Sequence, residues 1–323
     1  IDCGFQYNHI NFYDENDNYT TLRVKQVWDQ SHGKKYTTQT AIEAAQYDDA
    51  NDDTGHATHV SGIATGSYSG NYNYGVAKNS DIVMVSYGTT NTDITNGIKY
   101  IYDYATSVNK PAVINMSLGS HQGPHDGTST FDITCDNMQG AGRLLVGSAG
   151  NEGNMKLYRE EQLSASQSSI DYVTFEKGYD KTSFIDIWGD NNQKFTVQIV
   201  IANTAGDVVF TSQAYNGISS STYSLTSLSY SAYATGNINI YTGKSRNATN
   251  TRGNVLVYLN SFSMKSGYKL GIKFNSTTTG TIRAWGSEYE VYWVSGAKTS
   301  TIGEIGGTGK KIITVGAYTT FAR

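Results

Sequence analysis

The sequence predicts an α/β domain that is built on a parallel β-sheet and is interrupted by an inserted all-β domain. Three observations lead to this fold class. In the first half, short apolar runs alternate with stretches whose apolar residues have helical spacing. From residue 155 to about residue 301, β-branched and aromatic runs alternate with turns rich in Gly, Asn and Ser. After that stretch, the pattern of a buried strand returns.

In the first half, strand and helix patterns follow one another along the chain. The expected elements are a strand over 81–86, a helix over 93–108, a strand over 112–116, a helix over 128–138 and a strand over 144–147. Either Thr92 or Asp93 is expected to cap the first helix. Strands that alternate with helices indicate a doubly wound parallel sheet with right-handed crossovers.

The segment 155–301 has a different composition. Between residues 155 and 305 there is no His, Cys or Pro, whereas Ser, Thr, Tyr and Val are frequent. Closely spaced short strands predict a β-sandwich or jelly roll. Its clearest expected strands are 184–188, 195–201, 237–241, 254–259, 268–274 and 289–294. We therefore expect an α/β domain over 1–154, an inserted β domain over 155–301 and a continuation of the α/β domain over 302–323.

Composition excludes several classes of protein. The 323 residues include 24 Lys+Arg and 28 Asp+Glu, a net charge of −4, and contain no basic block. Nucleic acid is therefore not an expected partner. No apolar run approaches the roughly 20 residues of a membrane span. Two cysteines, Cys3 and Cys135, are too few for a disulfide scaffold, and their redox state stays open.

Three side chains have the chemistry of acyl transfer. Asp2 follows the end of a short strand, His56 is expected in the first turn of a helix behind Gly55, and Asn151 follows the strand 144–147. Loops at the carboxyl ends of parallel strands can converge on one site. A neutral imidazole can remove a hydroxyl proton, a carboxylate can hold its tautomer, and an amide N–H can stabilise an oxyanion.

The sequence motifs around these residues resemble those of the subtilisin-like serine peptidases. The matching motifs are Asp2-Cys3-Gly4, Gly55-His56-Ala57-Thr58-His59-Val60-Ser61-Gly62-Ile63, Asn115-Met116-Ser117-Leu118-Gly119, Ala149-Gly150-Asn151-Glu152-Gly153 and Thr314-Val315-Gly316-Ala317. The resemblance covers residues 1–154 and about 301–320. The β insertion is similar in position and pattern to the jelly roll of clostridial germination subtilases.

The resemblance implies a role for each matched residue. Asp2 would be the acid of the catalytic triad, His56 the general base and Asn151 the oxyanion donor. The resemblance also implies two substrate-binding segments. Ser117, Leu118 and Gly119 would pair with an extended peptide or protein substrate, and Ser148, Ala149 and Gly150 would line the first specificity pocket.

One departure from the family concerns the nucleophile. The family word Gly-Thr-Ser-Met-Ala belongs after the Val-Gly-Ala strand and does not occur among the 323 residues. Gly127-Thr128-Ser129-Thr130 precedes Asn151 and so has the wrong chain order, and a Gly-x-Ser-x-Gly elbow is also absent. We therefore expect this chain to be inactive alone and to need a C-terminal segment, which could be a separate chain.

Other interpretations remain open at this level. Ala57 stands where the family has glycine, which leaves room for a non-catalytic relative that binds a protein or a glycan. The aromatic residues of the insertion, Trp188, Trp285, Trp293, Tyr289 and Tyr292, could form a sugar platform, although core packing is the default for alternating strand positions.

The expected chemistry requires no cofactor. Structural calcium is left open as an alternative, because acidic loops are more often simply solvated. Two oxygen-rich loops, residues 14–17 and 48–53, could bind it. His59 is expected to be a buried hydrogen-bonding residue, since its spacing from His56 is not that of a zinc helix. We expect the protein to be secreted or attached to the cell envelope, with no leader visible in the sequence.

Overall fold

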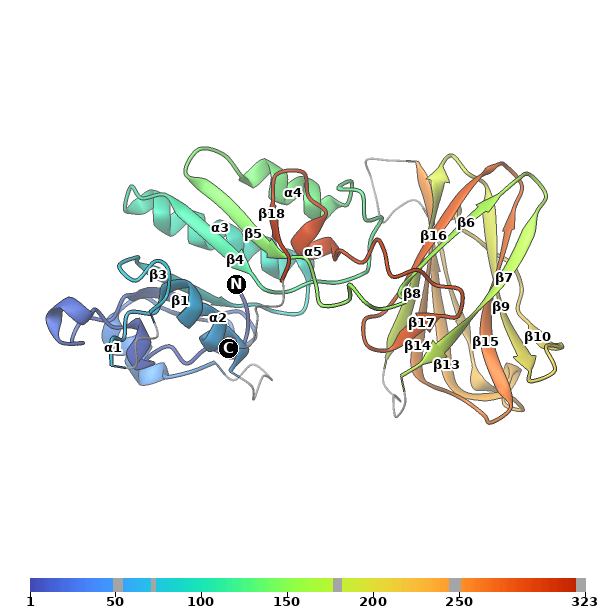
Figure 1. The fold of residues 1–323 in the computed structure, drawn as a ribbon, viewed down its shortest axis with the longest axis horizontal. Helices are drawn as coiled ribbons and strands as arrows, with labels where there is room; N and C mark the ends of the chain where they lie inside the picture. Colours follow the sequence, from blue (N-terminus) through green and yellow to red (C-terminus); the bar gives the residue numbers. More distant parts are fainter. Residues whose placement is uncertain (49–54, 71–73, 177–181, 244–250, 318–323) are drawn as a thin grey trace, which may run out of the picture. The chain divides into compact units, whose positions relative to one another are not determined.

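A computed structural model of the chain describes residues 1–48, 55–70, 74–176, 182–243 and 251–317 (Figure 1). These residues form two compact units. The first contains residues 1–118, 134–148 and 311–315, and the second contains residues 119–133, 149–310 and 316–317. The boundaries predicted from composition, at residues 154 and 301, remain predictions.

The first unit contains two three-stranded sheets. One has the order β2-β1-β3, with β1 (Val24–Asp29) antiparallel to β2 (Lys34–Tyr36) and parallel to β3 (Ile82–Ser86). The other has the order β18-β5-β4 and is parallel throughout. Its strands are β4 (Ala112–Met116), β5 (Arg143–Ser148) and β18 (Ile313–Val315). The parallel α/β part of the prediction is confirmed, but its strands divide between two sheets.

Four helices accompany these strands in chain order: α1 (Gln39–Ala45), α2 (His56–Thr65), α3 (Asn91–Ser107) and α4 (Thr130–Met138). The predicted cap of α3 was wrong, because Thr90 caps this helix. Its side chain accepts a hydrogen bond from the Asp93 N–H, and the Asp93 carboxylate accepts one from the Thr90 N–H. This reciprocal capping box satisfies two N–H groups that the helix itself leaves unpaired.

The second unit consists mainly of two antiparallel sheets whose inner faces share one hydrophobic core (Figure 1). One sheet has the order β10-β9-β15-β7-β17, with β11 paired to β9, and the other has the order β12-β13-β14-β8-β16-β6. The strands are β6 (Tyr158–Leu163), β7 (Ser168–Phe175), β8 (Ser183–Asn191), β9 (Phe195–Asn203), β10 (Val208–Thr211), β11 (Tyr215–Asn216), β12 (Ser221–Leu225), β13 (Ala234–Thr242), β14 (Arg252–Met264), β15 (Tyr268–Ser276), β16 (Gly280–Gly286) and β17 (Val291–Trp293). The short helix α5 (Glu304–Gly307) follows them.

The core of this sandwich explains the alternating sequence of the insertion. In β9, for example, Val197, Ile199 and Ile201 are fully buried and point to the same face of the sheet. The two-sheet sandwich thus agrees with the prediction, whereas the narrower jelly-roll topology remains a prediction. In the part of the chain that the structure describes, no helix has the length and apolar character needed to cross a membrane.

Candidate active site

Asp2 is held at the carboxyl end of β3. It forms a parallel bridge with Ser86, its N–H donates to the Val85 carbonyl at 3.1 Å, and its carbonyl accepts from the Tyr87 N–H at 3.3 Å. Only 5% of Asp2 is exposed. The residue therefore occupies a strand position whose side chain emerges where β3 ends.

His56 is the first residue of α2, as predicted. Gly55 precedes it with φ of +67°, a left-handed conformation that suits glycine. The N–H groups of Ala57 and Thr58 in the first helical turn donate to the carbonyls of Cys3 and Gly4 at 3.1 and 3.3 Å. The segment that follows Asp2 therefore caps the helix that carries His56, and one local structure positions both side chains.

The two side chains are directly hydrogen-bonded. His56 Nδ1 lies 2.8 Å from Asp2 Oδ1, which also accepts the Cys3 N–H at 2.8 Å. The Asp2 side chain is 7% exposed, whereas that of His56 is 47% exposed. A buried carboxylate thus holds Nδ1 of an imidazole that solvent still reaches, which is the arrangement needed for a general base acting through Nε2.

Ala57, where the family motif has glycine, is fully buried and belongs to the same hydrophobic core cluster as Phe5 and Ile82. Its methyl group packs inside the protein, whereas the neighbouring His56 side chain is partly exposed. This substitution therefore gives no structural reason to doubt the Asp2–His56 pair.

Asp48 supports this site in a way that the sequence did not indicate. Its two carboxylate oxygens accept the N–H groups of Gly4 and Phe5 at 3.1 and 3.0 Å, and the residue is 6% exposed. Burial raises the pKa of Asp48, although these hydrogen bonds oppose the shift. Asp48 thus fixes the turn between Asp2 and the rest of the chain.

The first unit contains a second Asp–His pair. Asp29, at the end of β1, contacts His32 across a turn, with 2.9 Å between Asp29 Oδ2 and His32 Nδ1. The His32 N–H also donates to Asp29 Oδ1 at 3.1 Å, so this pair closes a local turn of four residues. It offers an internal comparison for the Asp2–His56 pair.

The predicted substrate strand coincides with β4 and the residues after it. Asn115 Nδ2 donates to Ser117 Oγ at 3.0 Å, and Ser148 Oγ donates to the Leu118 carbonyl at 3.1 Å. Ser117 and Leu118 are half-buried. The two predicted substrate-binding segments thus contact each other through Ser148 and Leu118 in the first unit.

The second unit contains Asn151 together with Gly119, Ala149 and Gly150. Asn151 is exposed, and its N–H donates to Glu152 Oε2 at 2.8 Å. Gly150 has φ of +91°, and a Cβ at this position would lie 2.3 Å from Glu152 Oε2. The loop therefore requires glycine beside the side chain of Glu152.

Two residues of this loop region were not singled out from the sequence. Glu152 Oε2 lies 3.6 Å from His121 Nε2, and both side chains are buried. Burial alone would raise the pKa of Glu152, but hydrogen bonding and charge from His121 hold it below its usual value. His121 lies 31 positions before Glu152 in the sequence, and a separation of this length does not indicate that two residues are in contact.

Only part of the two oxygen-rich loops lies in the described residues. Asp14 caps a short 3₁₀ helix, and Asp17 accepts the N–H groups of Thr20 and Thr21. Apart from Asp48, the second loop lies outside the described residues. Among the described residues, no group of three or more His, Cys, Asp or Glu is placed to hold a metal ion.

His59 does not match its prediction, because it is exposed on α2 rather than buried. The prediction for the tryptophans holds: Trp188, Trp285 and Trp293 are 1–2% exposed and pack inside the second unit. Tyr289, by contrast, is 46% exposed. The predicted default of core packing therefore applies to all three tryptophans of the suggested sugar platform.

The sequence is similar to those of curated subtilisin-like proteins. The chain is 35% identical over 148 residues to a subtilisin of Bacillus sp. strain TA39, covering 43% of this chain and 32% of the relative. It is also 35% identical over 108 residues to subtilisin-like protease 3 of Pseudogymnoascus destructans, covering 31% of this chain and 24% of the relative. The chain thus spans about a third or less of these curated relatives.

A solved structure shows the same fold. The CspB protease of Clostridium perfringens superposes with a TM-score of 0.75 at 22% identity, covering 99% of this chain and 67% of that protein. The subtilase family model matches residues 1–267, which is more than half of the sequence. The chain belongs to the subtilase family.

Proposed function

We propose that this chain carries the acid, the general base and the oxyanion donor of a serine endopeptidase. The observation that carries the proposal is the 2.8 Å hydrogen bond between buried Asp2 and partly exposed His56. The family membership and the protease relatives support the same reaction class. Its substrate would be a peptide or protein, and the reaction needs no cofactor.

The steps follow from the chemistry of these residues. His56 Nε2 would accept the proton of a serine hydroxyl as that oxygen attacks the scissile carbonyl, and would later return it to the leaving amine. Asp2 would hold the Nδ1–H tautomer and stabilise the imidazolium. The Asn151 side-chain amide would donate a hydrogen bond to the oxyanion that develops on the carbonyl.

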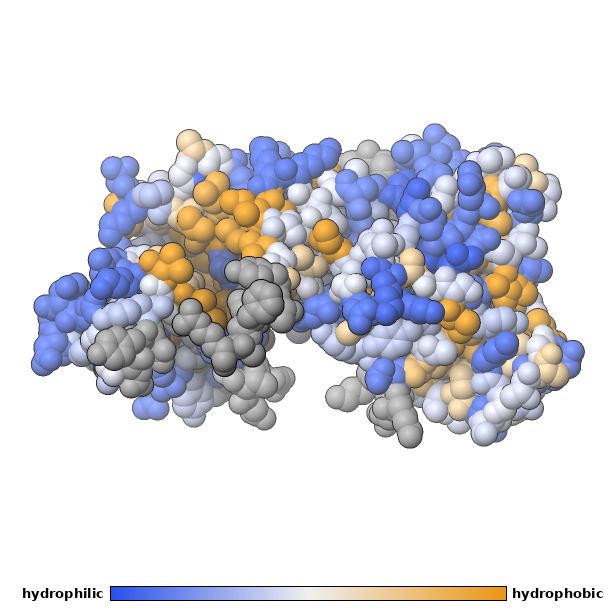
Figure 2. All heavy atoms as spheres, viewed as in Figure 1, coloured by the Kyte–Doolittle hydropathy of each residue, from blue (hydrophilic) through white to orange (hydrophobic). Residues whose placement is uncertain are grey.

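The serine would come from a segment outside the 323 residues. The sequence contains no family nucleophile word, so the proposal predicts that this chain alone does not hydrolyse peptides. An exposed apolar face in the first unit supports a further partner segment. Val113, Leu144, Ile313 and Val315 on β4, β5 and β18 are 43–66% exposed, and hydrophobic residues gather over this unit in Figure 2.

Pairing within this sheet places the exposed apolar side chains next to one another. Val113 is the register partner of Leu144, and Ile313 is the partner of Val146. Their neighbours Ile114 and Leu145 point to the other face and are buried. Because large exposed apolar patches mark interaction sites, this face is where we place the segment that supplies the serine.

An activity-based probe tests the proposal. A longer protein that contains the serine segment should react with a fluorophosphonate, and His56→Ala should abolish labelling while His32→Ala leaves it intact. Labelling that survives His56→Ala would refute the assignment. Failure of the folded longer protein to label would instead favour a non-catalytic binding protein. The burial of the three tryptophans argues against a glycan platform in that alternative.

Structural calcium and a location outside the cell or in its envelope remain predictions. The reaction as proposed uses neither a metal ion nor a membrane. Thermal unfolding of the longer protein with and without a calcium chelator tests whether it binds structural calcium.

A further inference from the structure

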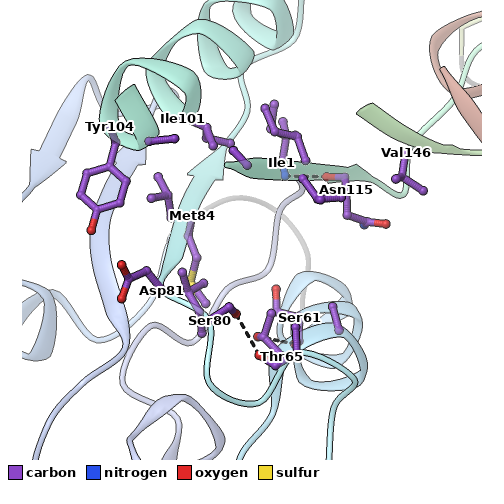
Figure 3. A pocket seen from close by; sticks show the side chains of 18 of the residues that line it. Ile1, Ser61, Thr65, Ser80, Asp81, Met84, Ile101, Tyr104, Asn115 and Val146 are labelled. Atoms are coloured by element: carbon purple, nitrogen blue, oxygen red, sulfur yellow. Dashed lines mark hydrogen bonds between the residues drawn. The ribbon is translucent and has the colours of Figure 1, made fainter. Parts of the chain in front are cut away.

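The segment that carries His121 continues the chain from β4 through the predicted substrate-binding residues 117–119. Figure 3 shows the end of β4, where the Asn115 carbonyl accepts a hydrogen bond from the Ile1 nitrogen at 2.9 Å. From residue 119 the segment belongs to the second unit, as do the loop of Asn151 and the β-sandwich. His121 therefore lies only two residues beyond the predicted substrate-binding segment.

A stack of aromatic rings fixes the side chain of His121. The His121 ring stacks on His125, with 5.3 Å between the ring centroids and 9° between the planes. His125 stacks in turn on Trp285 of β16 at 4.0 Å and 7°. Burial lowers the pKa of His125 to about 3, so this middle ring is neutral near pH 7. His121 and Trp285 are each 2% exposed, and the β-sandwich thus sets the plane of the His121 ring.

One edge of the His121 ring faces Glu152. His121 Nε2 lies 3.6 Å from Glu152 Oε2, which is an ionic contact at the long limit of a hydrogen bond. His121 Nδ1 is buried and has no hydrogen-bond partner among the described residues. The contact of His121 with the loop of Asn151 therefore depends on Nε2, and a different side chain with an N–H near this position could replace it.

The Glu152 carboxylate shapes the loop that carries Asn151. The same Oε2 atom accepts the Asn151 N–H at 2.8 Å. It also occupies the space beside Gly150, where a Cβ would lie 2.3 Å from it. The carboxylate is thus bound to the loop backbone on one side and to His121 on the other. If it moved, the backbone of Asn151 would lose its acceptor, and the direction of the Asn151 side chain depends on this backbone.

Glu288 brings a second carboxyl group toward His121 and Glu152. It lies in the turn between β16 and β17, and its Oε2 atom is buried without a hydrogen-bond partner among the described residues. Burial raises the pKa of Glu288, and the charges of His121 and Glu152 act on it in opposite directions. An N–H from His121 therefore offsets the repulsion between two carboxyl groups and favours the ionised Glu152 that accepts the Asn151 N–H.

We propose that His121 is a positioning residue for Asn151, because its Nε2 edge holds the Glu152 carboxylate and this carboxylate fixes the loop that directs the Asn151 side-chain amide. The inference rests on the proposed function, since Asn151 is the oxyanion donor of that reaction. A preorganised donor acts mainly in the transition state, so loss of His121 lowers turnover more than substrate affinity. In subtilisin, a member of the same family, removal of the oxyanion-donating asparagine lowers turnover about 10²–10³-fold. Displacement of Asn151 costs a part of this, about tenfold.

Hydrogen exchange in the 323-residue chain tests the contact without any need for activity. His121→Leu removes the Nε2 donor, whereas His121→Gln keeps an N–H near the same position. The Asn151 amide should exchange about tenfold or more faster in His121→Leu and within about threefold of wild type in His121→Gln. The Met155 amide, which donates to the Glu152 carbonyl at 2.9 Å, is the internal reference. An unchanged ratio of the Asn151 and Met155 rates in His121→Leu, or equal changes in both variants, would overturn the proposal.

Steady-state kinetics of a longer protein that contains the serine segment test the catalytic consequence. His121→Leu should lower kcat about tenfold with less than about a twofold change in KM, and His121→Gln should recover most of kcat. A loss confined to KM, or an equal loss of kcat in the two variants, would contradict a positioning role. No turnover in the unsubstituted longer protein would instead refute the proposed function, and the exchange rates would then decide by themselves whether His121 holds the loop.

Discussion

His56 Nδ1 and Asp2 Oδ1 lie 2.8 Å apart, and the same short segment that follows Asp2 caps the helix that begins with His56. Backbone hydrogen bonds therefore position the two residues, in addition to the hydrogen bond between their side chains. This relationship explains why two residues 54 positions apart can keep a fixed geometry.

Replacement of either member of the pair should abolish turnover in a longer protein that contains the serine. In subtilisin, a member of the same family, removal of the histidine lowers turnover about 2 × 10⁶-fold and removal of the aspartate about 3 × 10⁴-fold. We expect losses of this order for His56→Ala and Asp2→Ala, measured as turnover of a peptide substrate. His32→Ala should remain near wild type, and a comparable loss in this control would contradict the specific role of His56.

Asp48→Ala should destabilise the first unit and weaken the site. The substitution leaves the buried N–H groups of Gly4 and Phe5 without their acceptor, which costs about 1–3 kcal/mol. The free energy of unfolding from urea titration measures this effect. Asp103→Ala, on an exposed stretch of α3, is the matched control. Equal stability of the two variants would show that Asp48 does not hold the turn.

Gly150→Ala should disturb the loop that carries Asn151. Alanine at φ of +91° is strained, and its Cβ would meet Glu152 Oε2. We expect a loss of about 1–3 kcal/mol in stability and a lower turnover in the longer protein. Gly153→Ala, three residues along the same loop, has open space around it and should be tolerated. The reverse ranking of the two variants would contradict the loop geometry.

Glu304 should make stability depend on pH. Burial, with the nearby Asp132, raises the pKa of Glu304 to about 8. Between its ordinary value and about 8, the folded protein keeps a proton that the unfolded chain releases. The free energy of unfolding should therefore fall as pH rises through this window, by up to about 1.4 kcal/mol per pH unit.

Glu304→Gln isolates this contribution. The variant should flatten the decline in stability between pH 5 and pH 8, as measured by urea unfolding at several pH values. Glu176→Gln, at an exposed position, should keep the wild-type slope. An unchanged slope in Glu304→Gln would show that Glu304 titrates normally.

The sequence predicted elements well where burial is two-sided or periodic. The strand 112–116 matches β4 at both ends, because this segment is an apolar run after Pro111. The strand β1 was not predicted, since Lys25 and Gln26 interrupt its apolar pattern. Burial in β1 is irregular, so its residues show neither strict alternation nor a continuous apolar run.

The site was predicted in part for a similar reason. Asp2 and His56 lie in recognisable sequence motifs. Asp48 and Glu152, in contrast, accept hydrogen bonds from backbone N–H groups, and no sequence pattern reveals such contacts. His59 was expected to be a buried hydrogen-bonding residue once its spacing from His56 had ruled out a zinc helix, yet it is exposed on α2. The division of the strands between two sheets was not predictable, because it depends on long-range pairing, β1 with β3 and β4 with β5, that local sequence patterns do not specify.

The tautomer of His56 is the most direct test of the central claim, that Asp2 holds the imidazole as a general base. Nitrogen-15 NMR of the neutral ring in the 323-residue chain should show that Nδ1 is protonated and that Nε2 is the acceptor. The substitution Asp2→Asn should shift protonation toward Nε2. A ring protonated at Nε2 in the wild-type protein, or one unaffected by Asp2→Asn, would contradict the claim.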